Sequence, residues 1–177
     1  MTKRTPSRAV SEVDLARAWI EWLVDTRRGY LEALLKLPKK ERLRDRGASF
    51  PSLQDIFLHV LGNNVWWFES VPGNRQEAHI DIKGRLSDAQ IRAQVARVAT
   101  LSRRLARSLT PARLSKVFVV RGVQGNGKPY ELRASLRTII WHMVEEELQH
   151  RGEMNALLWQ LDEDAPTRAW FSSRLAT

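Results

Sequence analysis

A length of 177 residues and a hydrophobic content of 43% suit one globular domain with a sizeable core, so we expect residues 1–177 to form a single domain. The absence of cysteine excludes disulfides, thiolate metal sites and a cysteine nucleophile, so any thiol chemistry needs a thiol from outside the chain. No run of about 18 apolar residues is present, and residues 1–10 form a basic tail without the apolar segment of a signal peptide. We therefore expect a cytoplasmic protein with no membrane partner.

The formal net charge of +9 suggests contacts with nucleic-acid phosphates. The basic residues are, however, spread over the N-terminal tail, the segment from Lys39 to Arg46, the third predicted helix and the predicted hairpin. No glycine-rich phosphate loop, zinc-finger spacing or RNA-binding aromatic motif accompanies them. We interpret the charge as a solvated surface, and a basic nucleic-acid-binding bundle stays as the third functional hypothesis.

Two long amphipathic helices are predicted for the first part of the chain. Apolar residues at helical spacing indicate a helix over residues 11–37, with Ser11 as its N-cap. A charged connection covers residues 38–49. The second helix is expected to begin at residue 51 or 52 and to end before Pro72, because proline and the glycine after it stop a helix.

Two more long helices and a hairpin are predicted for the rest. The third helix opens with a capping box at Ser87-Asp88-Ala89-Gln90 and runs to about Leu109. The connection before it is longer than a tight turn needs, which indicates a crossover. Two short strands, residues 116–121 and 128–133, flank a glycine-rich turn, and the last helix spans about residues 135–161.

These elements predict an all-α fold, a four-helix bundle with two crossover-type connections and a small β-hairpin at residues 116–133 before the last long helix.

The last predicted helix carries polar groups inside an apolar helical pattern, among them His142, His150 and three consecutive glutamates. Residues four apart lie on one face of a helix, so Glu146 and His150 can close on one divalent cation. On a helical wheel, Glu145 and Glu147 point away from this pair. Such a pair alone is also typical of an ordinary surface contact, so a metal site needs a third ligand.

His59 is the candidate third ligand because it interrupts the apolar face of the second predicted helix. A lone buried histidine is also typical of a hydrogen-bonded structural residue, but two such sites on packed helices support each other. His142 lies about 12 Å from His150 along the helix axis, so the two cannot bind one ion. His142 with Glu146 therefore stays open as the competing pair.

Two further patterns supply no ligand. Glu147 and His150 match the Glu-x-x-His signature of di-iron bundles, but that signature needs a second copy, and Ile56 occupies the corresponding position before His59. His79 lies in a polar run and is expected to be solvated.

The sequence around these residues resembles the DinB/YfiT-like superfamily of metal-dependent enzymes. The resemblance extends over about residues 13–166 and rests on Leu58-His59-Val60-Leu61, the paired Trp66 and Trp67, and His150-Arg151-Gly152-Glu153. It implies a ligand set of one histidine on the second helix and two histidines at i and i+4 on the last, and these positions fall on His59, residue 146 and His150. Residue 146 is glutamate here, and both zinc and ferrous iron accept two histidines and one carboxylate.

The resemblance implies a divalent ion (Zn, Ni or Fe) that activates water or a low-molecular-weight thiol, and so a hydrolase-like or thiol S-transferase activity on a small-molecule substrate. It also implies a homodimer. Asp55, Asn63 and Glu153 are expected to orient the ligating imidazoles. The alternative hypothesis is a non-catalytic binding or stress-response bundle, which the glutamate at position 146 favours.

Overall fold

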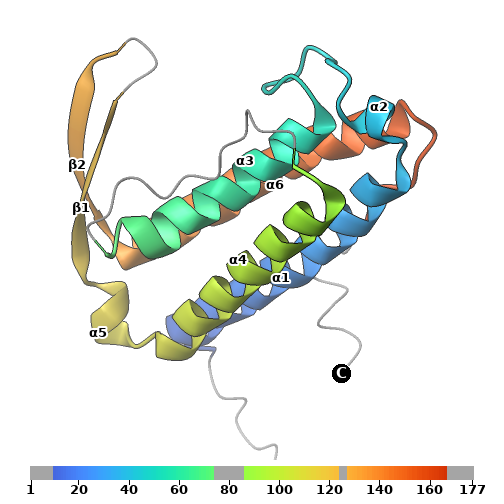
Figure 1. The fold of residues 1–177 in the computed structure, drawn as a ribbon. Coiled ribbons are helices and arrows are strands. Elements are labelled where there is room, and N and C mark those ends of the chain that lie inside the picture. The colour runs from blue at the N-terminus through green and yellow to red at the C-terminus, as the bar shows by residue number, and fades with distance from the viewer. Residues whose placement is uncertain (1–9, 74–85, 124–126, 167–177) are drawn as a thin grey trace, which may run out of the picture.

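The structure is a computed structural model that describes residues 10–73, 86–123 and 127–166. In these residues long helices pack side by side, and a two-stranded antiparallel hairpin lies at one end (Figure 1). α1 (Glu12–Lys36) packs along α4 (Asp88–Ser108), and α3 (Leu53–Val65) packs along α6 (Leu136–Trp159). The predicted all-α bundle with a small hairpin is confirmed.

Ion pairs near the helix ends define the direction of each helix. Glu12, at the start of α1, pairs with Arg137, at the start of α6, so these two helices run parallel. Arg92, near the start of α4, pairs with Glu32, near the end of α1, so α4 is antiparallel to α1. α3 runs in the same direction as α4 (Figure 1).

Of the two expected crossovers, one follows from these directions. Because α3 and α4 run the same way, α4 begins at the opposite end of the bundle from the one where α3 ends, as a crossover requires. The connection from α4 to α6 instead joins two antiparallel helices at the hairpin end, through α5 (Pro111–Leu114) and the two strands. It therefore does not cross the length of the bundle, which corrects the second expectation.

Serine side chains determine where the long helices begin. The hydroxyls of Ser11, Ser52, Ser87 and Ser135 each accept a hydrogen bond from the backbone N–H three residues further on. Gln90 closes the predicted capping box by accepting from the Ser87 backbone N–H. Each cap satisfies a donor that a helix start would otherwise leave free, so the predicted starts of these helices are confirmed.

Three short elements were not predicted. α2 (Lys39–Arg42) lies in the expected charged connection, and α5 follows α4. The π-helical turn η1 (Trp66–Ser70) continues α3 beyond Val65. One turn is too short to show an apolar period, so a sequence pattern gives no signal for it.

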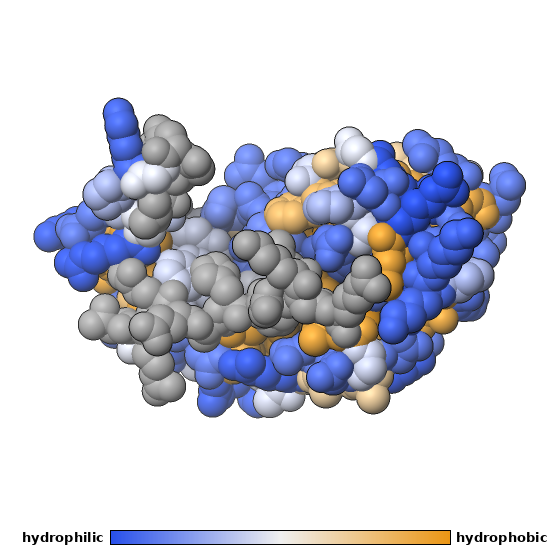
Figure 2. Space-filling model, turned by 45° about the horizontal axis from the view of Figure 1, so that its top comes forward, coloured by the Kyte–Doolittle hydropathy of each residue, from blue (hydrophilic) through white to orange (hydrophobic). Residues whose placement is uncertain are grey.

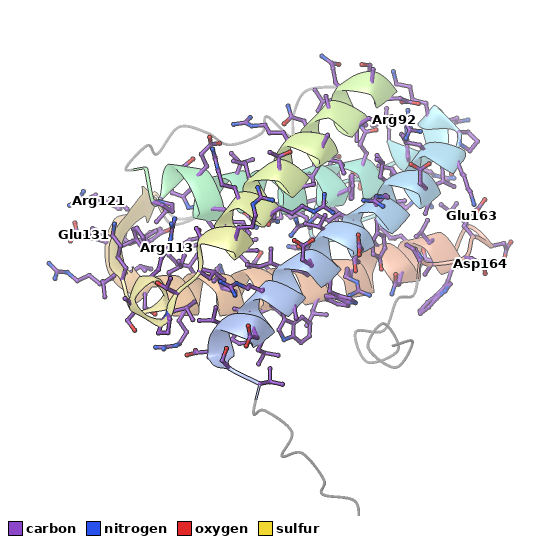
Figure 3. All side chains as sticks on the ribbon, turned by 90° about the horizontal axis from the view of Figure 1, so that it is seen from below. Arg92, Arg113, Arg121, Glu131, Glu163 and Asp164 are labelled. Atoms are coloured by element: carbon purple, nitrogen blue, oxygen red, sulfur yellow. The ribbon has the colours of Figure 1, made fainter. Side chains whose placement is uncertain are left out.

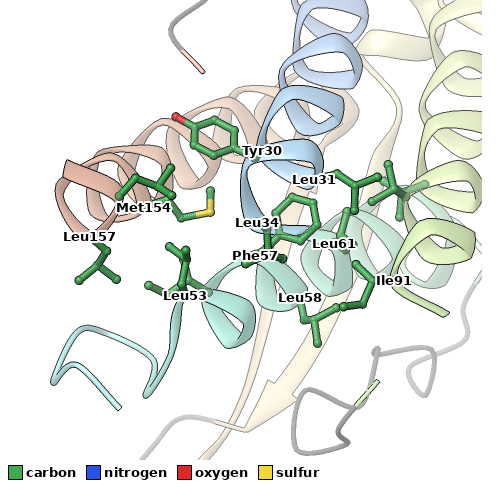
Figure 4. Close-up of a cluster of buried hydrophobic side chains, with 14 of the residues drawn as sticks. Tyr30, Leu31, Leu34, Leu53, Phe57, Leu58, Leu61, Ile91, Met154 and Leu157 are labelled. Atoms are coloured by element: carbon green, nitrogen blue, oxygen red, sulfur yellow. The ribbon is translucent and has the colours of Figure 1, made fainter. Parts of the chain in front are cut away.

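The core near α2 is built from apolar side chains, most often leucine, of α1, α3, α4 and α6 (Figure 4). Phe57, Leu58 and Leu61 contribute from α3, Leu34 from α1 and Met154 from α6, and all five are buried. Burying such a side chain contributes about 1.5–3 kcal/mol. This core holds α3 against α6.

The hairpin packs one face on the bundle. β1 (Val117–Val123) and β2 (Pro129–Ser135) pair with Val120 opposite Leu132. Val120 is fully buried, with Phe118 partly buried beside it in a second core cluster. Val117 and Val119 lie on the opposite face and are exposed, as strand alternation requires.

The surface in Figure 2 is mostly hydrophilic, with small and separated apolar areas. Arg121 and Glu131 form an ion pair on the hairpin, at the other end of the molecule from Glu163 and Asp164 (Figure 3). Within the described residues, no helix is both long and apolar enough to cross a membrane. The basic tail, His79 and the tip of the hairpin turn lie outside the described residues.

Candidate metal centre

Three predicted ligands converge where α3 and α6 pack against each other. His59 Nε2 lies 3.8 Å from Glu146 Oε2, and His150 Nε2 lies 3.6 Å from the same oxygen. One donor atom from each residue can be chosen so that all three lie within 4.8 Å of one another. In the part of the chain that the structure describes, this is the one group of three or more such side chains that could hold a metal ion.

The three side chains differ in depth. The His150 side chain is only 6% exposed, whereas those of His59 and Glu146 are 24% and 27% exposed. Glu146 lies within an apolar helical pattern in the sequence, but its carboxylate is partly exposed. The cluster therefore has an inner imidazole and an outer side that is in contact with solvent.

Glu153 orients His150. Its Oε2 lies 2.9 Å from His150 Nδ1 and accepts a hydrogen bond from the Ser49 hydroxyl at 2.6 Å. Although burial alone would raise the pKa of the Glu153 carboxyl, hydrogen bonds from Ser49 and His150 and the charges of His150 and His59 lower that pKa below its usual value. An ionised Glu153 accepts a hydrogen bond from His150 Nδ1–H, so Nε2 carries the lone pair, which faces Glu146.

His59 is held between a ring and an amide. Phe50 stacks on the imidazole with a centroid separation of 4.1 Å. Asn63 Nδ2 lies 2.9 Å from His59 Nε2, and because an amide nitrogen only donates, Nε2 is the acceptor. Both histidines thus present an unprotonated Nε2 to the cluster, which is the form that binds a metal.

The loop before α3 supplies Ser49 and Phe50. Its ends are joined by a hydrogen bond from the Arg46 backbone N–H to the Pro51 carbonyl at 2.8 Å. Gly47 adopts a φ of +64°, a left-handed conformation that glycine adopts without strain. This closed loop therefore brings the hydroxyl to Glu153 and the ring to His59.

Other predicted residues lie elsewhere. Asp55 was expected to orient His59, but it belongs to the N-cap of α3, where its carboxylate accepts a hydrogen bond from the Ser52 hydroxyl at 2.6 Å. The ring of His142 packs edge-on against Trp67 at 5.1 Å, and His142 is not part of the three-residue group. The alternative pairing of His142 with Glu146 is therefore not the one that the structure brings to His59.

Glu147 does not point towards solvent, and sequence reasoning missed its partner. Its side chain is 2% exposed, and both carboxylate oxygens accept hydrogen bonds from Arg27 Nε, at 2.9 and 3.0 Å. Arg27 also donates to Ser102 on α4 and to Asn64 on α3. One residue from each long helix thus joins a polar network inside the bundle.

A signal for this network is present in the sequence. Arg27 continues the spacing of the buried Ile20, Leu23, Tyr30 and Leu34 on α1, and Glu147 lies four residues after the buried Met143. Two side chains of opposite charge, an arginine and a glutamate, at positions where the helical pattern expects core residues predict a buried ion pair.

Comparisons with known proteins agree with this fold. The family model for mycothiol S-transferase matches residues 18–163. The crystal structure of a DinB-like protein from Bacillus cereus ATCC 10987 is similar in fold, with a TM-score of 0.60 and 15% sequence identity over 85% of this chain and 95% of that chain. At this identity the likeness shows the fold alone. No curated protein matches the sequence.

Proposed function

The chain belongs to the mycothiol S-transferase family, within the DinB/YfiT-like superfamily, and we propose that it is a metal-dependent thiol S-transferase. His59, Glu146 and His150 hold the divalent ion in this proposal. The observation that carries it is the convergence of their donor atoms from two helices within 4.8 Å of one another.

The donor set fits a divalent ion. Two imidazole nitrogens and one carboxylate oxygen are a ligand combination that zinc, nickel and ferrous iron accept. Glu153 fixes the orientation of the inner imidazole, and Phe50 packs on the outer one. Such outer contacts are typical of metal-ligating histidines, whose second nitrogen donates to a carboxylate.

The ion, when bound, would act as a Lewis acid that lowers the pKa of a nearby thiol. The chain has no cysteine, so the sulfur nucleophile comes from a low-molecular-weight thiol such as mycothiol. In the transfer, a sulfur–carbon bond forms, the bond to the leaving group breaks with its electron pair on that group, and the thiol proton passes to solvent. Glu153 keeps its hydrogen bond to His150 Nδ1 throughout, so the imidazole does not turn.

The test combines metal content with transfer activity. We expect protein purified without chelators to contain about one divalent ion per chain by elemental analysis. It should also accelerate the reaction of mycothiol with 1-chloro-2,4-dinitrobenzene. An ion with no thiol transfer but with hydrolysis of an activated ester would favour the hydrolase-like activity, and no ion would favour the non-catalytic bundle.

Substitutions of the three proposed ligands test where the ion binds. His59→Ala, His150→Ala and Glu146→Gln should each weaken metal retention at least about tenfold, because each removes one donor atom. Glu145→Gln is the matched control, since residue 145 is exposed on the same helix. Glu147 is not a suitable control, because it is buried against Arg27. Loss of the ion in His142→Ala, with retention in His150→Ala, would place the site one turn or more away.

A further inference from the structure

Asn63 joins two of the three proposed ligands with a single amide. It lies one turn after His59 on α3, and its Nδ2 is 2.9 Å from His59 Nε2 and 3.0 Å from Glu146 Oε2. The same nitrogen therefore links donor atoms of two helices. No other described side chain has a hydrogen bond to both of these atoms.

The Asn63 amide nitrogen lies where a cation would interact favourably with His59 Nε2 and Glu146 Oε2. Its two N–H hydrogens point to two atoms with lone pairs, as a cation between those atoms would. A cation bonded to both His59 Nε2 and Glu146 Oε2 takes up these lone pairs, and the NH₂ group then has no acceptor at that position. A half-turn of the terminal amide exchanges Nδ2 for Oδ1 there.

The carbonyl oxygen of Asn63 is available for this exchange. Within the described residues it has no hydrogen bond, whereas the neighbouring amide of Asn64 is fully engaged by Arg27 and by the Val60 carbonyl. Glu153 Oε2 is engaged by His150 Nδ1 and Asp55 Oδ2 by Ser52, and neither side chain has a hydrogen bond to His59 Nε2 or Glu146 Oε2. Asn63 thus contacts donor atoms of two proposed ligands and has, among these residues, an amide oxygen without a hydrogen bond.

We propose that Asn63 is a fourth protein ligand, which holds His59 and Glu146 together in the metal-free protein and turns its amide to offer Oδ1 to the ion. This inference rests on the proposed function, because it needs an ion at the cluster. An amide oxygen is a ligand that divalent cations accept. The site then has two nitrogen and two oxygen ligands from the protein, and its remaining positions stay open to the thiol.

The experiment measures affinity for Zn²⁺ by competition with a chelating dye. Asn63→Ala should weaken binding about tenfold or more, and Asn63→Asp should bind at least as tightly as the natural chain, because it restores an oxygen and adds negative charge. Asn155→Ala is the matched control: it removes another partly buried asparagine, whose partner is Tyr30 on α1, and should leave the affinity unchanged.

A spectroscopic readout separates ligation from a structural role. With Co²⁺ in the site, the visible absorption spectrum should change in Asn63→Ala and remain in Asn155→Ala, since the spectrum reports the number and type of ligands. Equal or tighter Zn²⁺ binding by Asn63→Ala would overturn the inference and show that the amide only has to move away. If the natural chain binds but His59→Ala does not, the proposed metal site stands whatever the result for Asn63; if the natural chain binds no ion, both fail.

Discussion

Glu153 links the protonation of the candidate site to the stability of the protein. The pKa of its carboxyl is lower in the folded chain than the value of 4.5 in the unfolded chain. Glu153 therefore stabilises the fold at pH values above 4.5, and this stabilisation is lost as the pH falls through the folded pKa. Its hydrogen bonds to Ser49 and His150 also tie the loop before α3 to α6. One carboxylate therefore both orients a candidate ligand and holds two segments together.

The change Glu153→Gln tests this role. We expect the metal-free variant to be less stable than the natural chain at pH 7, with the difference shrinking below about pH 4.5, because protonation removes the same interaction from the natural chain. Urea unfolding at a series of pH values measures this difference. Glu145→Gln, exposed on the same helix, is the control. A difference that is independent of pH would contradict the assignment.

The convergence of the candidate ligands could be predicted in part from local spacing, whereas their surroundings could not. Glu146 and His150 are four residues apart on one helix, and Asn63 lies one turn from His59, so each pair follows from the helical repeat. Asp55 has the same spacing from His59 in the other direction, but Ser52 engages it at the helix start. Phe50 and Ser49 come from an irregular loop, whose path no periodic pattern specifies.

At the level of helices, the Arg27 network aligns the elements that carry the site. Asn64 and Glu147 directly follow Asn63 and Glu146, so the network fixes α3 and α6 at the same level at which the candidate ligands meet. Ser102 adds α4, and Arg27 itself lies on α1. The buried ion pair thereby helps to set the relative positions of α3 and α6.

Removing one partner of this pair should destabilise the fold strongly. Glu147→Gln or Arg27→Met leaves a buried group without its partner, and we expect a loss of about 3–5 kcal/mol in the free energy of unfolding. Replacing both, as Arg27→Met with Glu147→Leu, should recover most of that loss. Glu32→Gln, which breaks the exposed pair with Arg92, should change stability by less than about 1 kcal/mol. Chemical denaturation measures all four, and a loss below 1 kcal/mol for Glu147→Gln would contradict the expectation.

The long helices could be predicted, but not which of them lie side by side. Their apolar periods and serine caps are local, and each predicted start is confirmed. The packing of α1 on α4 and of α3 on α6 depends on contacts between distant segments, such as Arg17 donating to the Leu109 carbonyl at 2.8 Å. The resemblance to a known superfamily indicated only that the second and last helices meet, and gave no information on the packing of α1 against α4.

At the scale of the whole molecule, the positive charge is distributed and partly neutralised. Exposed arginines on α4 pair with carboxylates of other elements, as Arg92 with Glu32, Arg97 with Glu69 and Arg103 with Glu21. The hairpin adds the pair of Arg121 and Glu131. Paired arginines give less attraction for phosphates than a clustered, unpaired basic face.

The affinity for nucleic acid should accordingly be low. We expect a dissociation constant in the non-specific range, about 10⁻⁴–10⁻⁶ M at physiological salt, for duplex and single-stranded DNA of random sequence. Fluorescence anisotropy with labelled oligonucleotides measures this constant. Tighter binding that survives added salt would reverse the order of the functional hypotheses.

The outward face of α6 is the surface that we expect to pair two copies of the chain. Leu148 and Trp159 are 45% and 61% exposed, and they lie on one side of the helix with the exposed Gly152 and Ala156 between them. Small residues between large apolar ones allow two helices to approach closely, and a two-fold pair brings the same stripe of each copy together.

We therefore predict a homodimer by light scattering at tens of micromolar protein, and a monomer for the double variant Leu148→Lys with Trp159→Lys. Val117→Lys, an equally exposed apolar position on the hairpin, should leave the dimer intact, and a monomeric mass for the natural chain would rule out this pairing.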